Sequence, residues 1–189
     1  MSKTQAGQLR IVAGIWRSRL LQIAAVDGLR PTSSRIRETL FNWLGPDIRG
    51  ARCLDLCAGT GALGIEALSR GAAEVLFVEN SRSAAATLRQ NLSSLDASGA
   101  EIVIAEAQDV LAVSAPSEFD IVFLDPPFAA DLHGELCRLL SQRAWLASGA
   151  QIYIELDKQK PVPRMPDNWR IDKDKTAGNV RYMLTTNET

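Results

Sequence analysis

The sequence contains few cysteines and only one histidine, and this scarcity limits the metal and redox chemistry available to it. Three cysteines and one histidine occur in 189 residues. An odd number of cysteines in a chain of this length does not indicate a disulfide framework. Cys53 and Cys57, with Cys137 and His133 as the remaining soft ligands, would form a poor zinc site. Reduced, buried cysteines of a cytosolic protein are the better interpretation, so we predict no metal site.

Long apolar segments are also missing. The first ten residues, MSKTQAGQLR, are polar and lack the apolar core of a secretory signal. No uninterrupted apolar segment approaches the ~20 residues that a membrane-spanning helix needs. The fractions of hydrophobic residues (46%) and charged residues (23%) are those of an ordinary globular protein. We therefore expect a soluble, cytoplasmic protein with no membrane partner.

The net charge of −1 conceals an uneven distribution of charge. Residues 1–37 carry seven basic residues and one acid, which leaves 14 basic and 21 acidic residues, a balance of −7, for the other 152. A basic arm on an acidic body indicates a polyanionic partner for the arm. A solvated surface without a partner is the alternative. The basic residues are Lys3, Arg10, Arg17, Arg19, Arg30, Arg35 and Arg37.

The hydrophobic pattern predicts a hairpin and a helix, followed by alternating strands and helices. Residues 9–23 read as two short strands around Gly14. A helix over 35–44, with Ser34 as its N-cap, ends at Gly45. Short apolar strands separated by helices are typical of a parallel sheet that is covered on both faces. The later predicted strands are 53–58, 74–79, 101–106, 119–125, 151–156 and a hairpin of 169–176 with 180–186, and the helices are 62–71, 81–92 and 132–140.

A glycine-rich loop follows the first of these later strands. Gly59, Gly61 and Gly64 form a GxGxxG pattern, which suits a loop around a nucleotide ligand. Glu79 lies twenty residues after Gly59, at the end of the next strand, where an acid accepts hydrogen bonds from a ribose. NAD fits these two features as well, and glycines that only permit a tight turn are a further alternative.

Asp55 distinguishes between the candidate ligands of this loop, a dinucleotide and S-adenosylmethionine. It lies in the strand four residues before the first glycine, where its carboxylate would repel the pyrophosphate of a dinucleotide. S-adenosylmethionine instead brings an ammonium and a sulfonium, which a carboxylate attracts, and its own carboxylate can bind N–H groups at a helix start. A carboxylate that caps the loop backbone remains the alternative.

The sequence Asp125-Pro126-Pro127-Phe128 follows the strand 119–124 and is a candidate site for an amino group. Two consecutive prolines remove two N–H donors and leave carbonyl acceptors. The Asp125 carboxylate and the Pro126 carbonyl can both accept hydrogen bonds from one –NH2 group, and Phe128 can stack on a planar base. A dehydrogenase has no use for this arrangement, although a simple turn after a strand would look similar.

These segments resemble a known family. Asp55-Leu-Cys-Ala-Gly-Thr-Gly resembles motif I of the class I S-adenosylmethionine-dependent methyltransferases, and Asp125-Pro-Pro-Phe resembles their amino-methylating motif IV. From about residue 9 to 184, the chain is similar to the bacterial 16S ribosomal RNA guanine-N2 methyltransferases of the RsmD type. The narrower resemblance rests on RIVAGIWR (10–17), RPT (30–32), RIRETLFNWL (35–44), EALSRGA (66–72) and KTAGNVRY (175–182). Cys57 and Ser33-Ser34 depart from the family pattern, which has an aromatic residue and Thr-Asp there.

The resemblance implies a fold and a function. The expected fold is α/β: a Rossmann-like class I methyltransferase sheet, mostly parallel with an antiparallel C-terminal hairpin, flanked by helices and preceded by a small N-terminal β-hairpin extension. Residues 1–45 would form the RNA-contacting hairpin and helix, and residues 46–189 the methyltransferase domain. The expected cofactor is S-adenosylmethionine. The expected partner is 16S ribosomal RNA within an assembled or partly assembled small subunit, methylated by a monomer.

The resemblance also assigns roles to individual residues. The adenine edge of the cofactor would be bound by Glu106, with Asp109 as the alternative residue. Trp16 would stack on an RNA base, with an apolar staple that holds the hairpin as the alternative role. His133 is expected to face solvent. The implied catalytic residues are Asp125, Pro126, Pro127 and Phe128; the cofactor-binding residues are Asp55, Ala58, Gly59, Gly61, Glu79, Asn80, Glu106 and Ala107; the RNA-binding residues are Arg10, Trp16, Arg17, Arg19, Arg35 and Arg37.

Two other functions remain open from the sequence. An adenine-N6 methyltransferase acting on DNA or RNA would present a similar amine to the same clamp. An RNA-binding assembly factor could keep the fold without catalysis, although the retained acids and Asp125-Pro-Pro-Phe argue against it. An NAD-dependent oxidoreductase would leave Asp55 and Asp125 unexplained.

Overall fold

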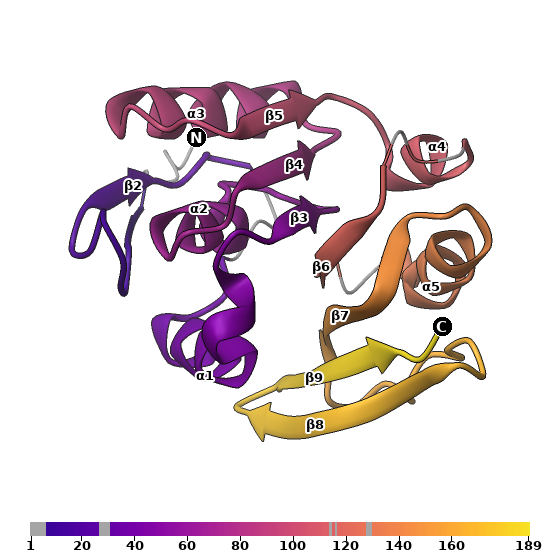
Figure 1. Ribbon diagram of the computed structural model, residues 1–189. Helices are drawn as coiled ribbons and strands as arrows, with labels where there is room; N and C mark the ends of the chain where they lie inside the picture. The colour runs from indigo at the N-terminus through magenta and orange to yellow at the C-terminus, as the bar shows by residue number, and fades with distance from the viewer. Residues whose placement is uncertain (1–6, 27–30, 114, 116, 128–129) are drawn as a thin grey trace.

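The computed structural model describes residues 7–26, 31–113, 115, 117–127 and 130–189. One seven-stranded sheet runs through the molecule in the order β5-β4-β3-β6-β7-β9-β8 (Figure 1). The strands β3 to β7 are parallel, and β9 pairs antiparallel with both β7 and β8. The strands are β3 (Arg52–Asp55), β4 (Glu74–Val78), β5 (Ala100–Val103), β6 (Phe119–Leu124), β7 (Leu146–Asp157), β8 (Trp169–Ala177) and β9 (Val180–Asn187).

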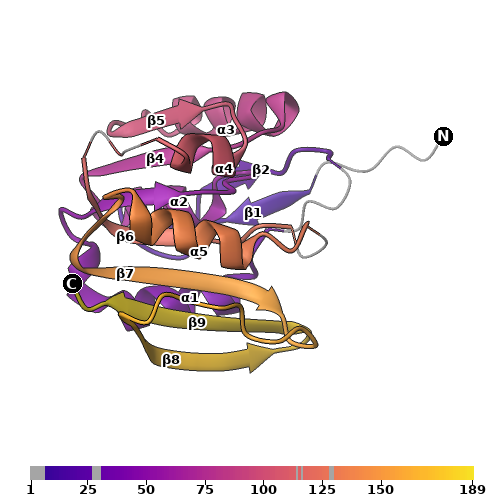
Figure 2. The same cartoon turned by 90° about the vertical axis from the view of Figure 1, so that its right-hand side faces the viewer.

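Helices cover both faces of this sheet, and each face has its own apolar core (Figure 2). Alternate strand residues divide between the two cores, as the two-residue period of a strand requires. Cys53 and Phe123 face α1, α2 and α3, whereas Leu54 and Val122 face α4 and α5. The helices are α1 (Ser34–Leu44), the 3₁₀ turn η1 (Gly45–Ile48), α2 (Ala62–Ser69), α3 (Arg82–Ser94), α4 (Ala107–Leu111) and α5 (His133–Gln142).

The N-terminal hairpin forms a separate two-stranded sheet of β1 (Gln8–Arg10) and β2 (Leu20–Gln22). It is not detached from the rest, because Ile11 and Leu21 are buried in the same core as Ile36 of α1 and Cys53 of β3. The predicted hairpin, the parallel sheet and the antiparallel C-terminal strands are therefore all present.

Several details of the sequence-based prediction were wrong, and one is that the strand expected over 53–58 ends at Asp55. The N-cap of α1 is Ser33, whose hydroxyl accepts from the backbone N–H of Ile36, and Ser34 is already helical. The strand expected to reach Glu106 ends at Val103, and a short helix that we did not predict, α4, follows Glu106.

Among the described residues, no helix has both the length and the apolarity that crossing a membrane requires.

Candidate active site

Two glycines of the segment that leads from β3 into α2 lie where a side chain would not fit. Gly61 has φ +81°, and a Cβ there would lie 2.4 Å from Cδ1 of Leu88. A Cβ on Gly64 would lie 2.2 Å from the ring of Phe77 in β4. The first glycine therefore permits the left-handed turn, and the second allows α2 to pack closely on the sheet.

Two buried carboxylates hold the backbone of this loop. Oδ2 of Asp55 accepts from the N–H of Gly64 at 3.0 Å. The Glu79 carboxylate accepts from the N–H groups of Gly59 and Ser81, both at 2.7 Å. Burial, opposed by the Gly64 bond and aided by the Glu79 charge, raises the pKa of Asp55 to about 7. Asp55 thus caps the loop, and its ionisation is finely balanced near neutral pH.

Polar groups continue along the ends of the neighbouring strands. Nδ2 of Asn80 donates to both carboxylate oxygens of Glu106, at 3.1 Å each. Glu106 is the N-cap residue of α4, whose first residue, Ala107, is buried. This bond connects the end of β4 with the start of α4, so Glu79 and Glu106 border one continuous edge of the sheet.

Asp125 follows β6 directly, at the same edge. Its Oδ2 accepts from the hydroxyl of Thr32 at 3.2 Å. Burial and the nearby carboxylates of Glu155 and Asp55 raise the pKa of Asp125 well above its ordinary value, and the Thr32 bond opposes this rise. Pro126 is buried beside it. Phe128, the predicted stacking residue, lies outside the described residues.

Three buried side chains that sequence reasoning missed adjoin Asp125. Thr32 contacts it directly, and the hydroxyl of Tyr153 donates to Oε2 of Glu155 at 2.7 Å. The alternation of the strand sequence QIYIEL could have revealed Tyr153 and Glu155, because these two residues lie on the same face of β7.

His133 was expected at the surface, and this expectation was wrong. It is 4% exposed, and its Nε2 lies 2.7 Å from the carbonyl oxygen of Glu155. Burial lowers the pKa of His133, so its ring stays neutral at physiological pH. The packing of α5 against β7 explains its place: the imidazole satisfies a strand carbonyl.

The acids of the site have no basic partner among the residues that the structure describes. None of the ion pairs found there includes Asp55, Asp125 or Glu155. Uncompensated carboxylates are costly to bury. The edge therefore suits a ligand with positive charge and many hydrogen-bond donors.

Most of the predicted RNA-binding residues lie on the surface. Arg10, Arg17, Arg19 and Arg35 are exposed. Trp16 is partly buried and packs against the core on the side of α1, α2 and α3, which is the arrangement expected of an apolar staple.

Arg37 was expected on this surface and is instead fully buried. Its guanidinium donates to Glu66 at 3.0 Å and to the carbonyls of Thr32 and Arg10. Glu66, also fully buried, accepts from the N–H groups of Val12 and Ala13 at 2.9 Å each. Arg37 and Glu66 therefore attach the N-terminal hairpin to α2, and Arg37 is unavailable to RNA.

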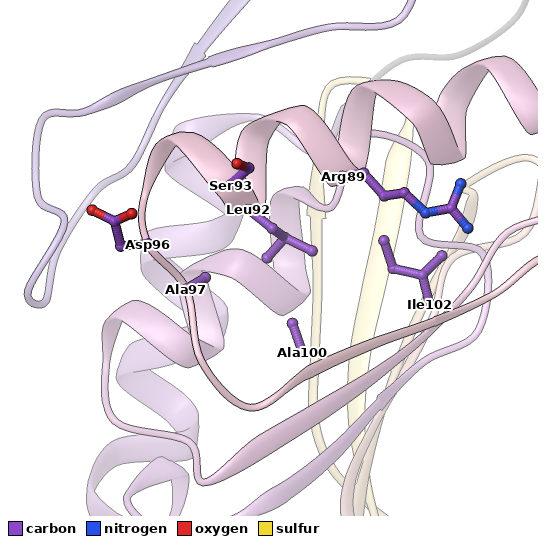
Figure 3. Close-up of a pocket in the computed structure, with 7 residues that line it drawn as sticks. All are labelled: Arg89, Leu92, Ser93, Asp96, Ala97, Ala100 and Ile102. Carbon is purple, nitrogen blue, oxygen red and sulfur yellow. The ribbon is translucent and has the colours of Figure 1, made fainter.

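A surface hollow of about 410 Å³ lies elsewhere, between α3 and β5 (Figure 3). It adjoins Asp96 and Ala97 after α3 and Ala100 at the start of β5. The strand acids lie at the carboxyl ends of their strands, so this hollow is not part of the candidate site.

Comparison with known proteins places the chain in a family. The family described as "Conserved hypothetical protein 95" matches residues 9–186. Ribosomal RNA small subunit methyltransferase D of Escherichia coli strain K12 is 45% identical over 183 residues, which cover 97% of this chain and 92% of that protein. The chain belongs to the ribosomal RNA small subunit methyltransferase D family.

Solved structures show that this methyltransferase D family member has the expected fold. The structure of yhhF from Escherichia coli, described as a methyltransferase, has a TM-score of 0.90 and 43% identity, covering 97% of this chain and 99% of that one. A methyltransferase complexed with SAH is 12% identical with a TM-score of 0.73, covering 98% of this chain and 57% of that one, a likeness of fold alone. The mostly parallel sheet with antiparallel C-terminal strands is thus a class I methyltransferase fold.

Proposed function

We propose that this protein transfers a methyl group from S-adenosylmethionine to the exocyclic N2 of a guanine in 16S ribosomal RNA of the small ribosomal subunit. The observation that carries the proposal is the position of Asp125 and Pro126 after β6, at the sheet edge that also holds Asp55 and Glu79. Asp125 and Pro126 would accept hydrogen bonds from the target amine, and Asp55 and Glu79 would bind the cationic nucleoside. Both groups of residues lie at one edge and would therefore serve one reaction. The family membership supports ribosomal RNA as the acceptor.

The residues present fit S-adenosylmethionine. Asp55 offers negative charge to its ammonium, and the first turn of α2 offers N–H groups to its carboxylate. Each oxygen of Glu79 bonded to a loop amide keeps a lone pair for a ribose hydroxyl. The hydrogen bond from Asn80 joins Glu106 to this edge. This position favours Glu106 over Asp109 as the residue that would accept a hydrogen bond from the adenine amine, with Ala107 beside it. Ala58, Gly59 and Gly61 would line the methionine end.

The chain's own groups prepare the target amine. When bound, S-adenosylmethionine supplies an electrophilic methyl group. The Asp125 carboxylate and the Pro126 carbonyl would accept hydrogen bonds from the two amine hydrogens, which turns the nitrogen lone pair out of conjugation with the ring. Asp125 would then accept the one proton that the nitrogen loses as its bond to the methyl carbon forms and the bond between that carbon and sulfur breaks. Stacking on Phe128 and a turn stiffened by Pro127 complete the proposed grip.

The exposed arginines would contact RNA phosphates. We expect the double variant Arg17→Glu and Arg35→Glu to bind 16S RNA at least ~10-fold more weakly and with a shallower salt dependence, because each lost phosphate contact reduces counterion release. Filter binding at several salt concentrations measures both effects. Arg89→Glu, on the exposed side of α3, is the matched control and leaves binding unchanged. Equal affinity of the double variant and the wild type would show that the surface formed by the hairpin and α1 does not contact RNA.

The pKa of Asp55 predicts a pH dependence of cofactor binding. A carboxyl group with a pKa of about 7 is mostly neutral at pH 6 and mostly ionised at pH 8, and only the ionised form attracts an ammonium. Affinity for S-adenosylmethionine should therefore rise by roughly 5- to 10-fold between about pH 6 and about pH 8. Isothermal titration calorimetry at both values measures the change, and Asp55→Asn removes it. An unchanged affinity in the wild type would place the ammonium elsewhere.

Labelled methyl transfer tests the acceptor. We expect label from S-adenosylmethionine to enter 16S RNA within unmethylated small subunits and not duplex DNA. Label in DNA would favour the adenine-N6 alternative, since adenine presents its amine to the same clamp. Cofactor binding with no label in any acceptor would favour a non-catalytic assembly factor.

A further inference from the structure

Glu155 lies beside Asp125 by the register of the sheet. In the parallel pair β6–β7, Leu124 is opposite Ile154, so the next residues along, Asp125 and Glu155, are neighbours on one face. Adjacent strands are ~4.8 Å apart, which brings two such carboxylates close together. β6 and β7 lie side by side at the centre of the molecule (Figures 1 and 2).

The hydrogen bonds around this pair distribute two hydroxyl hydrogens between two carboxylates. Tyr153 donates to Glu155 at 2.7 Å, and Thr32 donates to Asp125 at 3.2 Å. The nearby Thr32 hydroxyl also lowers the pKa of Glu155, but its single hydrogen can serve only one acceptor at a time. Tyr153 supplies a donor to Glu155, and the Thr32 hydrogen goes to Oδ2 of Asp125. The other oxygen of Asp125 is then left for the target amine.

Among the described residues, the further charged group that acts on Asp125 is another acid, Asp55 from β3. Cys57, which follows β3, and Tyr153 on β7 are neutral titratable groups beside the pair, and His133 on α5 contacts the backbone carbonyl of Glu155. Glu155 is 5% exposed, and its charge raises the pKa of Asp125. A change at Glu155 therefore reaches Asp125 through charge as well as through Thr32.

We propose that Glu155 is a positioning residue for methyl transfer, which with Tyr153 assigns the Thr32 hydroxyl to Asp125 and thereby orients the Asp125 carboxylate toward the target amine. This inference rests on the proposed function of Asp125. Glu155 does not contact the amine itself; it acts through Thr32 and through its charge.

Glu155→Gln tests the inference, because glutamine keeps the shape and an acceptor for Tyr153 but removes the charge and adds an amide donor that competes at Asp125. We expect the single-turnover rate on the high-pH plateau to fall by ~10-fold or more, with S-adenosylmethionine affinity and the KM for RNA within about threefold of wild type. The acid limb of the pH–rate profile should move down by about one pH unit, since Asp125 loses a like charge beside it.

Two further variants keep the test decisive. Tyr153→Phe removes the donor of Glu155, so the Thr32 hydroxyl should move from Asp125 to Glu155; the loss of that bond raises the pKa of Asp125, and the acid limb should move up, opposite to its shift in Glu155→Gln. This variant serves if Glu155→Gln does not fold. Glu101→Gln, exposed on β5, should match the wild type. A slower rate with an unmoved acid limb in both site variants would reduce Glu155 to a packing role and overturn the inference. A wild type that methylates no guanine would instead overturn the proposed function.

Discussion

Asp125→Ala is expected to lower methyl transfer by ~10³-fold or more while S-adenosylmethionine binds with an affinity within about threefold of wild type. Alanine removes the carboxylate that accepts an amine hydrogen and then the proton. The side-chain contacts proposed for the cofactor come from β3, β4 and α4, so they survive the change. The effect should appear in the rate of the chemical step and not in cofactor affinity.

Single-turnover transfer and calorimetry, on the same preparations, measure the two quantities. Asp167→Ala is the matched control, because Asp167 is an exposed acid outside the sheet, and we expect wild-type values for both quantities. Turnover of Asp125→Ala within about tenfold of wild type would place the amine acceptor at another residue.

Glu66→Ala is expected to lower the free energy of unfolding by ~3–5 kcal/mol, because it leaves Arg37 as a buried, uncompensated charge. The glutamate accepts from four donors, of which Arg37 and the N–H groups of Val12 and Ala13 belong to the N-terminal segment. Its loss should loosen the hairpin from α2 as well as weaken the whole fold.

Urea denaturation measures the change in stability. Glu74→Ala, which removes the partly exposed ion pair with Arg52, is the comparison, and we expect it to cost less than ~1 kcal/mol. A loss of similar size in both variants would show that the buried network around Glu66 is not what attaches the hairpin.

The features that sequence reasoning located are those that local pattern determines. Gly61 and Gly64 occupy positions where a side chain would collide, and the parallel strands bring Asp55, Glu79 and Asp125 to one edge wherever the helices between them lie. Such residues can be found because their role follows from the strand end on which they lie.

The features that it missed depend on partners far along the chain. Arg37 looks like an exposed residue of a basic arm, and only its bond to Glu66, 29 positions away, explains its burial. The bond between His133 and the Glu155 carbonyl spans 22 positions. Burial of a polar side chain is decided by which element packs on it, and one sequence does not contain that information directly.

Identification of the methylated nucleoside tests the central claim most directly. Small subunits lacking the modification would be incubated with the protein and labelled S-adenosylmethionine, and their RNA digested to nucleosides and separated by chromatography. The account predicts label in N2-methylguanosine, absent with Asp125→Ala. Label in N6-methyladenosine, or guanine labelling that persists in Asp125→Ala, would contradict it.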